Sequence, residues 1–551
     1  MISKLRSQGS NLVAAGILLS RLAGLIREVV LGLALGNTPV TSAFRFAMRI
    51  PNVLQNLLGE GALSASFIPV YARLVEDGED GQADRLAGTV VSLLIGATAV
   101  LVAIGVLAAR PIVWVFTDFE ANPELFELAV TLLRITTLGL GFLVISAWCL
   151  GILNSHRSFF LPYVAPVVWT GAQIVTLVAA MTFDWSLNAS AIAVAWAVLA
   201  GGILQFVIQV PKVLQLAPNL KLSLTRTDEV RDVLRRFVPA VSSRGVVQLS
   251  SFIDTFLALL LVGSALATYG FALPLYLMPI SLFGFSVAAS ELAEMSRESG
   301  EEAVVSARVR PALRRVLVPA GFITAAYLTA GRTIVDALYG FPGRVFDKGF
   351  DDADVTAVWL VLLAFASGLP AAMTARITQN TLYSVGEVRG PARIAVVRLT
   401  VAVVLSAFLM FQLDWILVAG RSTFATLGDV PHWPPWERLP THIRQAQNPP
   451  PHLGIVGLAL GSSAASWVEW VLLRRMLRQR LNTPVKSGWF VPVSFAALAA
   501  GVVMLPLNFA PIPSPIDTVV INGLGAGVFA GTLWLQGIRS LGSTSEPATG
   551  D

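Results

Sequence analysis

Five arginines stand inside long apolar stretches of this 551-residue sequence. Arg21 and Arg27 interrupt the first stretch, Arg45 and Arg49 the second, and Arg244 a later one. A charged side chain at the centre of a bilayer costs roughly 2.5–3.5 kcal/mol on insertion scales, so it normally faces a cavity or a partner. Guanidinium groups bind phosphate through two parallel hydrogen bonds. Several of them in one wet cavity therefore predict a site for a multiply charged anion such as a diphosphate.

The second apolar stretch has the clearest pattern, because its polar residues recur every three or four positions. They are Ser42, Arg45, Arg49, Asn52, Asn56 and Glu60. This spacing places them on one face of a helix. Pro51 lies within the stripe and predicts a kink, since proline removes one backbone hydrogen bond.

A second polar face follows in a later apolar stretch, where Arg244, Gln248, Ser251 and Asp254 share one side of a helix. The alternative to a cationic cavity is that each arginine reaches the membrane surface or pairs with an acid. Acidic residues within the apolar stretches are few, so we expect most of these arginines to lack such partners.

The elements that position these residues are membrane spans. Hydrophobic residues make up 55% of the chain and charged residues only 13%, against roughly 25% charged in globular proteins. Apolar runs of the ~20 residues that cross a bilayer recur throughout. We expect about fourteen spanning helices, at 11–36, 41–75, 85–109, 122–151, 158–183, 187–210, 231–261, 267–296, 309–338, 354–385, 391–418, 453–479, 487–510 and 516–538.

The composition also excludes several functions. One Cys and four scattered His predict neither a metal site nor a cofactor. No nucleophile–base pair or phosphate loop is evident, so we predict no catalytic residue and no enzyme activity. The net charge of +5 comes from cations in short loops, which predicts membrane orientation rather than nucleic-acid binding. Their distribution places both termini in the cytoplasm.

A faint internal repeat divides the chain. The segment from Leu153 to Pro162 aligns with the segment from Leu382 to Pro391, and Pro51 aligns with Pro279 at nearly the same offset. We expect a six-helix lobe over 1–212, a second over 213–479, and helices 13 and 14 with a disordered tail over 480–551. Transporters built from such repeats bind substrate between the halves.

Two regions stand apart from this pattern. The Pro-rich stretch 419–452, with His432, Trp433 and Trp436, is expected as a partly ordered extracytoplasmic linker. Helices 13 and 14 contain hardly a charge beyond Asp517. They are either simple lipid-facing packing or an apolar groove for a long hydrocarbon tail.

Two N-terminal motifs are specific enough to indicate a family. The first is Ser20-Arg21-Leu-Ala-Gly24-Leu-Ile-Arg27-Glu28, and the second joins Ile50-Pro51-Asn52 to Gly59-Glu60-Gly61-Ala62. Gly151-Ile-Leu-Asn154-Ser155 and Ile253-Asp254-Thr255 follow. Together these motifs resemble the MurJ/MviN lipid II flippases, and the likeness covers essentially the whole chain.

The resemblance implies an all-α polytopic membrane protein of the superfamily that includes MATE-type exporters, with two six-helix lobes related by pseudo-twofold symmetry and a C-terminal helix pair. It implies translocation of lipid II, the undecaprenyl-diphosphate-linked peptidoglycan precursor, across the bacterial cytoplasmic membrane by alternating access. We expect a monomer whose partners are this substrate, membrane lipids and the cell-wall synthesis machinery. The candidate substrate-binding residues are Arg21, Arg27, Arg45, Arg49, Asn52, Glu60 and Arg244.

The sequence departs from the family pattern at several positions. The family's helix-2 aspartate is Ser42 here, its arginine pair after Pro-Asn is Gln55-Asn56, and its helix-8 arginine falls near the uncharged Pro274. Sodium sites in some members imply ion-coupling candidates, which are Asp254, Ser406 and Ser462. Three hypotheses stay open: a lipid II flippase, a flippase for another polyprenyl-diphosphate glycan, and a non-transporting lipid-binding scaffold. An antiporter of small cations is disfavoured because it would need an acidic cavity.

Overall fold

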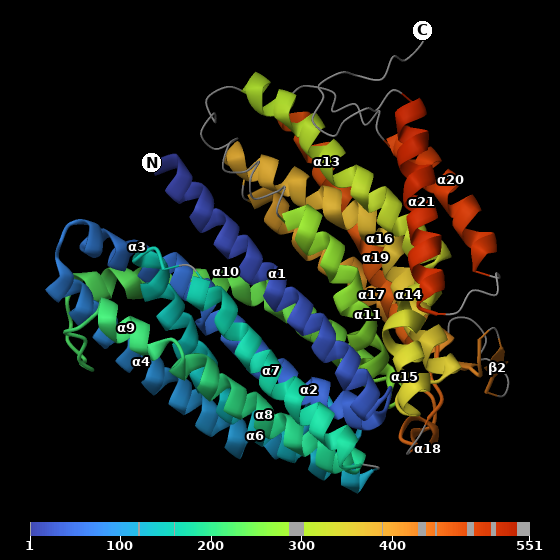
Figure 1. Ribbon diagram of the computed structural model, residues 1–551, viewed down its shortest axis with the longest axis horizontal. Coiled ribbons are helices and arrows are strands. Elements are labelled where there is room, and N and C mark those ends of the chain that lie inside the picture. The colour runs from blue at the N-terminus through green and yellow to red at the C-terminus, as the bar shows by residue number, and fades with distance from the viewer. Residues whose placement is uncertain are drawn as a thin grey trace. The chain divides into compact units, whose positions relative to one another are not determined.

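The computed structural model describes residues 2–536 apart from 120–121, 159, 286–301, 388, 422, 428–436, 447–448, 482–489 and 509–513. The described chain is overwhelmingly helical (Figure 1), which confirms the expected class. Ten of its helices are long and apolar enough to cross a membrane. Four other long helices are α1 (Ile2–Leu35), α2 (Pro39–Leu58), α10 (Asp228–Leu259) and α13 (Glu302–Thr329), and the first three contain all five arginines discussed above. With them the architecture is consistent with the fourteen expected spans.

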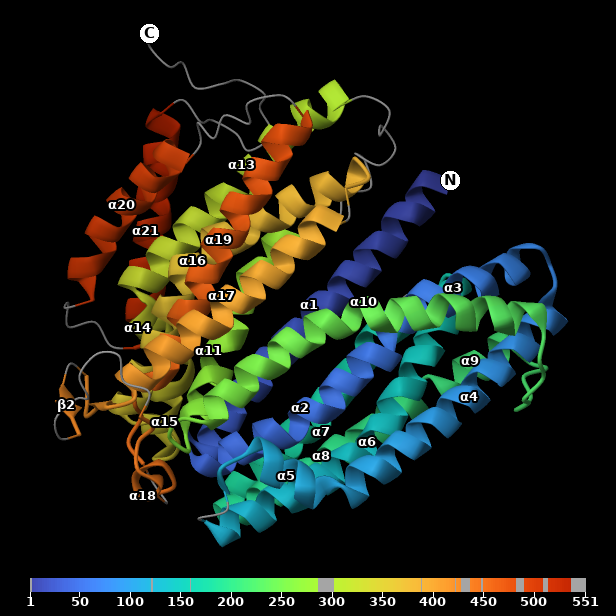
Figure 2. The same cartoon turned by 180° about the vertical axis from the view of Figure 1, so that it is seen from behind.

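The chain divides into two compact units at Ala267. The first contains α1 (Ile2–Leu35), α2 (Pro39–Leu58), α3 (Glu60–Glu76), α4 (Asp80–Leu107), α5 (Ala109–Phe116), α6 (Pro123–Ser155), α7 (Phe160–Thr182), α8 (Leu187–Val207), α9 (Val210–Leu216) and α10 (Asp228–Leu259). Helix α10 packs on α2 and α3 (Figure 2), so it belongs to the first compact unit. The boundary at residue 212 between two transport lobes stays a prediction.

The second unit begins within α11 (Ala265–Pro279). It continues with the π-helix η2 (Ile280–Phe285), α13 (Glu302–Thr329), α14 (Gly331–Val335), η3 (Asp336–Gly340), α15 (Phe341–Phe346), α16 (Asp352–Ser384), α17 (Arg389–Leu413), α19 (Gly454–Leu481), α20 (Phe490–Leu507) and α21 (Ile516–Leu535). Helices α16, α17 and α19 pack together, and α20 and α21 lie against α13 (Figure 1). The tail 540–551, which we expected to be disordered, lies outside the described residues.

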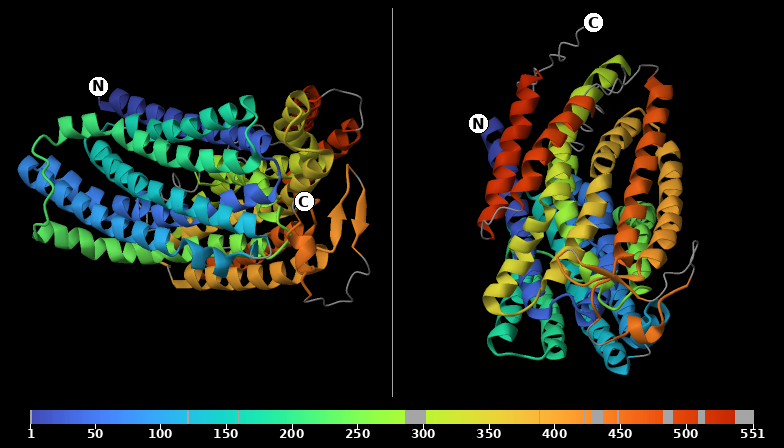
Figure 3. Two further views of the ribbon diagram at one scale, coloured as in Figure 1. Left: turned by 90° about the horizontal axis from the view of Figure 1, so that it is seen from below. Right: turned by 90° about the vertical axis from the view of Figure 1, so that its right-hand side faces the viewer.

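The Pro-rich loop contains regular structure that its sequence did not predict. Strands β1 (Ile416–Val418) and β2 (Phe424–Thr426) form an antiparallel hairpin (Figure 3), and α18 (Thr441–Arg444) adds one helical turn. The returning chain is fixed to β1, since the amide of Val418 donates to Pro451 O at 2.8 Å. His432, Trp433 and Trp436 lie outside the described residues.

The long second span of the sequence reading is two helices, because α2 ends at Leu58 and α3 begins at Glu60. Gly59 makes the break and donates its amide to Gln55 O at 2.7 Å. A Cβ at Gly59 would lie 2.6 Å from that same oxygen. Only glycine therefore fits this corner without displacing backbone.

The proline within α2 is compensated by a neighbouring helix. Pro51 has no amide hydrogen, so the carbonyl of Ala47, four residues earlier, loses its helical donor. The hydroxyl of Thr136 on α6 lies 2.9 Å from Ala47 O and 2.9 Å from Leu132 O of its own helix, so its one hydrogen is shared between the two carbonyls. The α2–α6 contact thus satisfies a backbone group that would otherwise be buried without a partner.

The second unit repeats this arrangement at the proline that aligns with Pro51. Pro279 ends α11 and removes the helical donor of Leu275 O, which accepts from the hydroxyl of Tyr327 on α13 at 2.7 Å. Both freed carbonyls accept a hydroxyl from another helix, and the internal repeat itself stays a prediction.

Candidate functional site

A buried carboxylate joins two of the predicted arginines in the first unit. Glu28 on α1 accepts from Arg27 at 2.6 Å through one oxygen and from Arg45 on α2 at 2.8 Å through the other. The side chain of Glu28 is 5% exposed, that of Arg45 15% and that of Arg27 24%. The two guanidinium groups and their shared carboxylate form a charged cluster with a positive excess.

An aromatic ring on α7 borders the same cluster. The Arg27 guanidinium carbon lies 5.7 Å from the ring centroid of Trp169, within the range of cation–π attraction. The Trp169 indole is held in turn by donating to Val198 O on α8 at 3.1 Å. Helices α1, α2, α7 and α8 therefore all contribute to the position of Arg27.

This pairing corrects one expectation from the sequence. We expected few acidic partners for the intramembrane arginines, yet Glu28 serves two of them. The sequence alone does not predict this bridge, because neighbouring residues of a helix point in different directions. The long arginine side chain nevertheless reaches its neighbour.

The other candidates on α1 and α2 lie further along the same two helices. Arg49 is half-buried one turn beyond Arg45, and Asn52 is half-buried close to the buried Pro51. Arg21 is exposed, roughly 9 Å further along α1 from Arg27 at 1.5 Å per residue. The stripe residues from Ser42 to Asn56 lie on α2, whereas Glu60 begins α3 beyond the break at Gly59, so the expectation that all six share one helix is wrong.

Ser42, the first member of that stripe, has a structural partner. Its hydroxyl oxygen accepts the backbone amide of Ala267 at 3.0 Å, and the side chain is fully buried. The side chains of Glu60 and Arg244 lie outside the described residues, although both positions are helical. Their roles stay predictions.

The ion-coupling candidates lie on three helices. Asp254 is half-buried on α10, Ser406 is buried on α17, and Ser462 is half-buried on α19. The Ser406 hydroxyl donates to Leu458 O at 2.9 Å and so fastens α17 to α19. Ion coupling through these residues stays a prediction.

The second unit contains an ion pair that the sequence reading missed. Arg398 Nε on α17 lies 3.2 Å from Glu469 Oε2 on α19, and their side chains are 33% and 12% exposed. Both residues fall near the middle of their helices. The antiparallel register that brings them together could not be read from two separate apolar runs.

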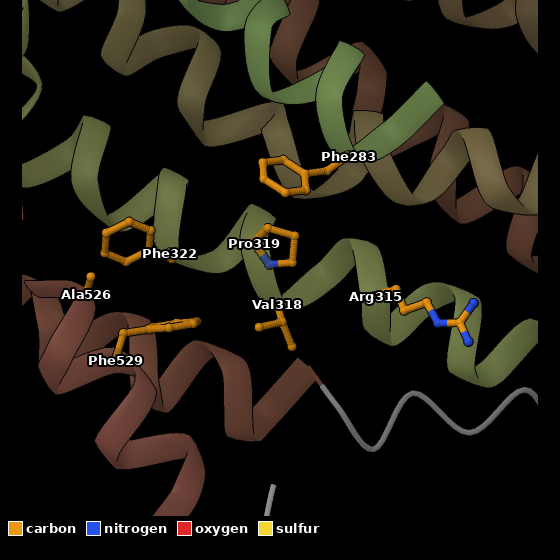
Figure 4. A pocket seen from close by; sticks show the side chains of 7 residues that line it. All are labelled: Phe283, Arg315, Val318, Pro319, Phe322, Ala526 and Phe529. Carbon is orange, nitrogen blue, oxygen red and sulfur yellow. The ribbon is translucent and has the colours of Figure 1, made fainter. Parts of the chain in front are cut away.

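An apolar pocket of about 260 Å³ lies where α21 meets α13 and η2. Figure 4 shows Phe322 and Phe529 on one side of it and Phe283 on another. Arg315 lies at one end, beyond Val318 and Pro319, with its guanidinium group turned away from the rings (Figure 4). The expected helices 13 and 14 are α20 and α21, and α21 contributes Ala526 and Phe529 to this pocket, while a groove for a hydrocarbon tail stays a prediction.

The sequence matches a known family over most of its length. Residues 32–428 match the family model described as "Lipid II flippase MurJ". The lipid II flippase of Burkholderia cenocepacia is 27% identical over 547 residues, covering 96% of each chain. A probable lipid II flippase of Aquifex aeolicus is 28% identical over 74% of this chain and 78% of its own.

The fold has solved counterparts in the same group. A structure described as a lipid II flippase in an inward closed conformation aligns with a TM-score of 0.73 and 20% identity, covering 96% of this chain and all of that one. An inward-facing MATE multidrug transporter aligns with a TM-score of 0.61 and 16% identity, over 85% of this chain and 96% of that one. These two matches confirm the MATE-like fold. The family match confirms the resemblance: the chain belongs to the MurJ lipid II flippases.

Proposed function

We propose that this protein translocates lipid II across the bacterial cytoplasmic membrane and that the Arg27–Glu28–Arg45 cluster binds the diphosphate. Family membership supports the substrate class. The observation that carries the proposed role of the cluster is its composition, two largely buried guanidinium groups on a single buried carboxylate. A diphosphate offers more negative charge than Glu28 and suits the same bidentate donors.

Glu28 takes a defined part in this proposal. Without substrate it neutralises part of the positive charge and holds both guanidinium groups within a few ångströms of each other. An arriving diphosphate competes for those donors, and Glu28 recaptures them once the head group leaves. Arg49, one turn along α2, adds positive charge on the same stripe.

The polyprenyl tail needs a different surface. The pocket between α13, η2 and α21 is lined chiefly by aromatic and aliphatic side chains, with Arg315 at one end. In this proposal it accepts part of the hydrocarbon tail, while Arg315 lies nearer the polar end.

Replacing Arg45 with Ala tests the proposed role of the cluster. The full chain is reconstituted in vesicles, and fluorescent lipid II reaching the opposite leaflet is measured. A lost charge-assisted hydrogen bond is worth about 1.5–3 kcal/mol, so the translocation rate should fall roughly tenfold to hundredfold. Arg110→Ala removes an exposed ion pair on the same unit and should leave the rate unchanged. Equal rates in both variants would contradict the assignment.

The scaffold hypothesis has one observation in its favour, namely that Arg27 and Arg45 already share a partner in Glu28. A scaffold would bind the lipid and leave it in its original leaflet. Complementation of a strain depleted of its own flippase separates the two functions, since only a transporter restores growth. A head-group series in the vesicle assay separates lipid II from other polyprenyl-diphosphate glycans.

A further inference from the structure

A cationic cavity lies at the end of the second unit where α17 begins and α19 ends. Its volume is about 550 Å³, and three arginines line it together with one glutamate, Arg389, Arg393, Arg480 and Glu387. Ile394 and Met476 supply apolar lining. The cavity is formed entirely by residues of one compact unit and is separate from the Arg27–Glu28–Arg45 cluster.

Both carboxylate oxygens of Glu387 are engaged by neighbours that line this cavity. One of its carboxylate oxygens accepts the amide of Gly390 at 2.9 Å, and the other pairs with Arg480. The hydrogen bond from Arg480, followed by the one from Gly390, lowers the pKa of Glu387, so the carboxylate stays ionised. With its oxygens engaged, Glu387 cancels one positive charge, and the cations remain in excess.

The surface of α17 changes from charged to apolar beyond the cavity. Arg389 and Arg393 are exposed in its first two turns, and Val396, Val397 and Val404 are exposed further along. A site for a free inorganic anion has no need of such a continuation. A phosphate attached to hydrocarbon chains matches both parts.

The equivalent corner of the first unit lacks this chemistry. In the register that aligns Leu153 with Leu382, Arg389 corresponds to Phe160 and Arg393 to Val164. Phe160 is 52% exposed at the start of α7. The arginines are therefore not a general requirement of this turn between helices.

We propose that the cavity at Arg389, Arg393 and Arg480 binds the phosphodiester head group of an anionic phospholipid, whose acyl chains lie along the exposed valines of α17. Basic pockets at the cytoplasmic ends of membrane helices suit such head groups, and our topology puts this end in the cytoplasm. The bound lipid is distinct from the transported substrate and would hold α17 and α19 together at the membrane surface.

The test measures lipid retention by the purified full-length protein. Native mass spectrometry follows the titration of the protein with phosphatidylglycerol and, separately, with phosphatidylcholine. The variant R389Q/R393Q removes two cations from the cavity, and R475Q/R478Q removes two exposed cations of α19 that do not line it. Each arginine near an anionic surface is worth roughly fivefold in affinity. We expect R389Q/R393Q to weaken phosphatidylglycerol binding about 30-fold.

Three further results are expected. R475Q/R478Q should bind phosphatidylglycerol like the natural protein, R389K/R393K should keep most of the affinity, and phosphatidylcholine should show no dependence on these arginines. Equal loss in the two glutamine variants would overturn the site. Complete displacement of the lipid by millimolar inorganic phosphate would overturn the lipid as occupant and assign the cavity to a free anion. Lipid II translocation by R389Q/R393Q, measured in parallel, distinguishes failure of this site from failure of the transport site.

Discussion

Helix α2 and its counterpart, α11 with η2, have the same proline and very different surfaces. Pro51 and Pro279 are aligned by the internal repeat, and each frees a carbonyl that a hydroxyl from another helix satisfies. The residues that precede them differ, because Arg45 and Arg49 correspond to Leu273 and Leu277. Both halves therefore have a proline whose freed carbonyl accepts a hydroxyl, but only the first half has arginines just before that proline.

The donors to those carbonyls also differ. Thr136 comes from α6, whereas Tyr327 comes from α13, which is not the equivalent helix. A freed carbonyl in a membrane interior needs a donor, and the source of that donor is open to change. Both halves thus supply a hydrogen-bond donor to the freed carbonyl, but from helices that are not equivalent.

Among the described residues, each unit nevertheless contains a charge cluster within its helices. In the first, Arg27 and Arg45 meet Glu28 beside Trp169. In the second, the repeat aligns Trp169 with Arg398, which pairs with Glu469. The first cluster has a positive excess, and the second is a neutral pair. This difference is consistent with anion binding in the first and helix packing in the second.

The largest expected effect comes from Glu28→Gln. It leaves Arg27 and Arg45 largely buried without their carboxylate, and breaking a buried ion pair costs about 3 kcal/mol. The free energy of unfolding, measured by SDS titration, should fall by this amount. Glu127→Gln breaks the exposed pair with Arg110. The Arg110 side chain is 60% exposed and that of Glu127 55%, so the loss should be less than about 1 kcal/mol. Equal losses would show that the first cluster is already solvated.

Arg398→Leu in the second unit should cost about 2 kcal/mol in the same titration, because Glu469 is left in the span without its cation. If the pair serves packing alone, the double variant Arg398→Leu/Glu469→Leu should recover most of the stability and keep transport, since apolar pairs replace buried ion pairs well. Recovered stability with lost transport would instead assign the pair a role in translocation, and the contrast between the two clusters would fail.

Much of this fold follows from apolar periodicity. The span expected at 354–385 is α16 at Asp352–Ser384, and that expected at 158–183 is α7 at Phe160–Thr182. Apolar runs of about 20 residues have the length of a spanning helix rather than of a spanning strand, and a helix satisfies their backbone internally, so their type is strongly determined. The polar stripe of α2 was predictable from the spacing of its polar residues.

The partners within the membrane were less predictable. The Glu28 bridge and the Arg398–Glu469 pair depend on how two helices pack, which a single apolar run does not encode. The hairpin of β1 and β2 was missed because two strands of three residues each, in a Pro-rich loop, leave too short a pattern. Periodicity predicted the elements here, whereas tertiary packing determined the contacts.

The comparison of the two prolines can be tested directly. Thr136→Val and Tyr327→Phe each leave a buried carbonyl without its donor, and each should cost about 1 kcal/mol. Pro51→Ala restores the amide hydrogen to Ala47 O within α2. In that background Thr136→Val should therefore cost clearly less, and a double-mutant cycle in SDS titration measures the difference. Additive effects would mean that Thr136 stabilises α6 alone and does not compensate Pro51.

The smallest expected effect concerns the turns that follow α7 and α17. Both contain Asp-Trp, at Asp184-Trp185 and Asp414-Trp415. Asp184 is exposed in a short turn, whereas Asp414 is 2% exposed beneath the β1–β2 loop. Burial raises the pKa of Asp414 to about 8, which Arg438 opposes. The backbone oxygen of Asp414 also accepts from His452 Nδ1 at 2.6 Å.

A carboxyl whose pKa is raised on folding stabilises the fold in its protonated form, so this contribution is lost as pH rises toward about 8. Burial lowers the pKa of His452 below 6.5, so above pH 6.5 that ring is neutral in the folded loop and its titration does not overlap that of Asp414. Hydrogen-exchange protection of Ile416–Val418, corrected for the intrinsic pH dependence of exchange, should fall between pH 6.5 and 8 and then level off. One proton limits the fall to about tenfold per pH unit. Asp414→Asn should remove this dependence, and Asp184→Asn should leave it unchanged, because Asp184 lies in an exposed turn of the other unit. A pH-independent hairpin in the natural protein would mean that water reaches the Asp414 carboxyl.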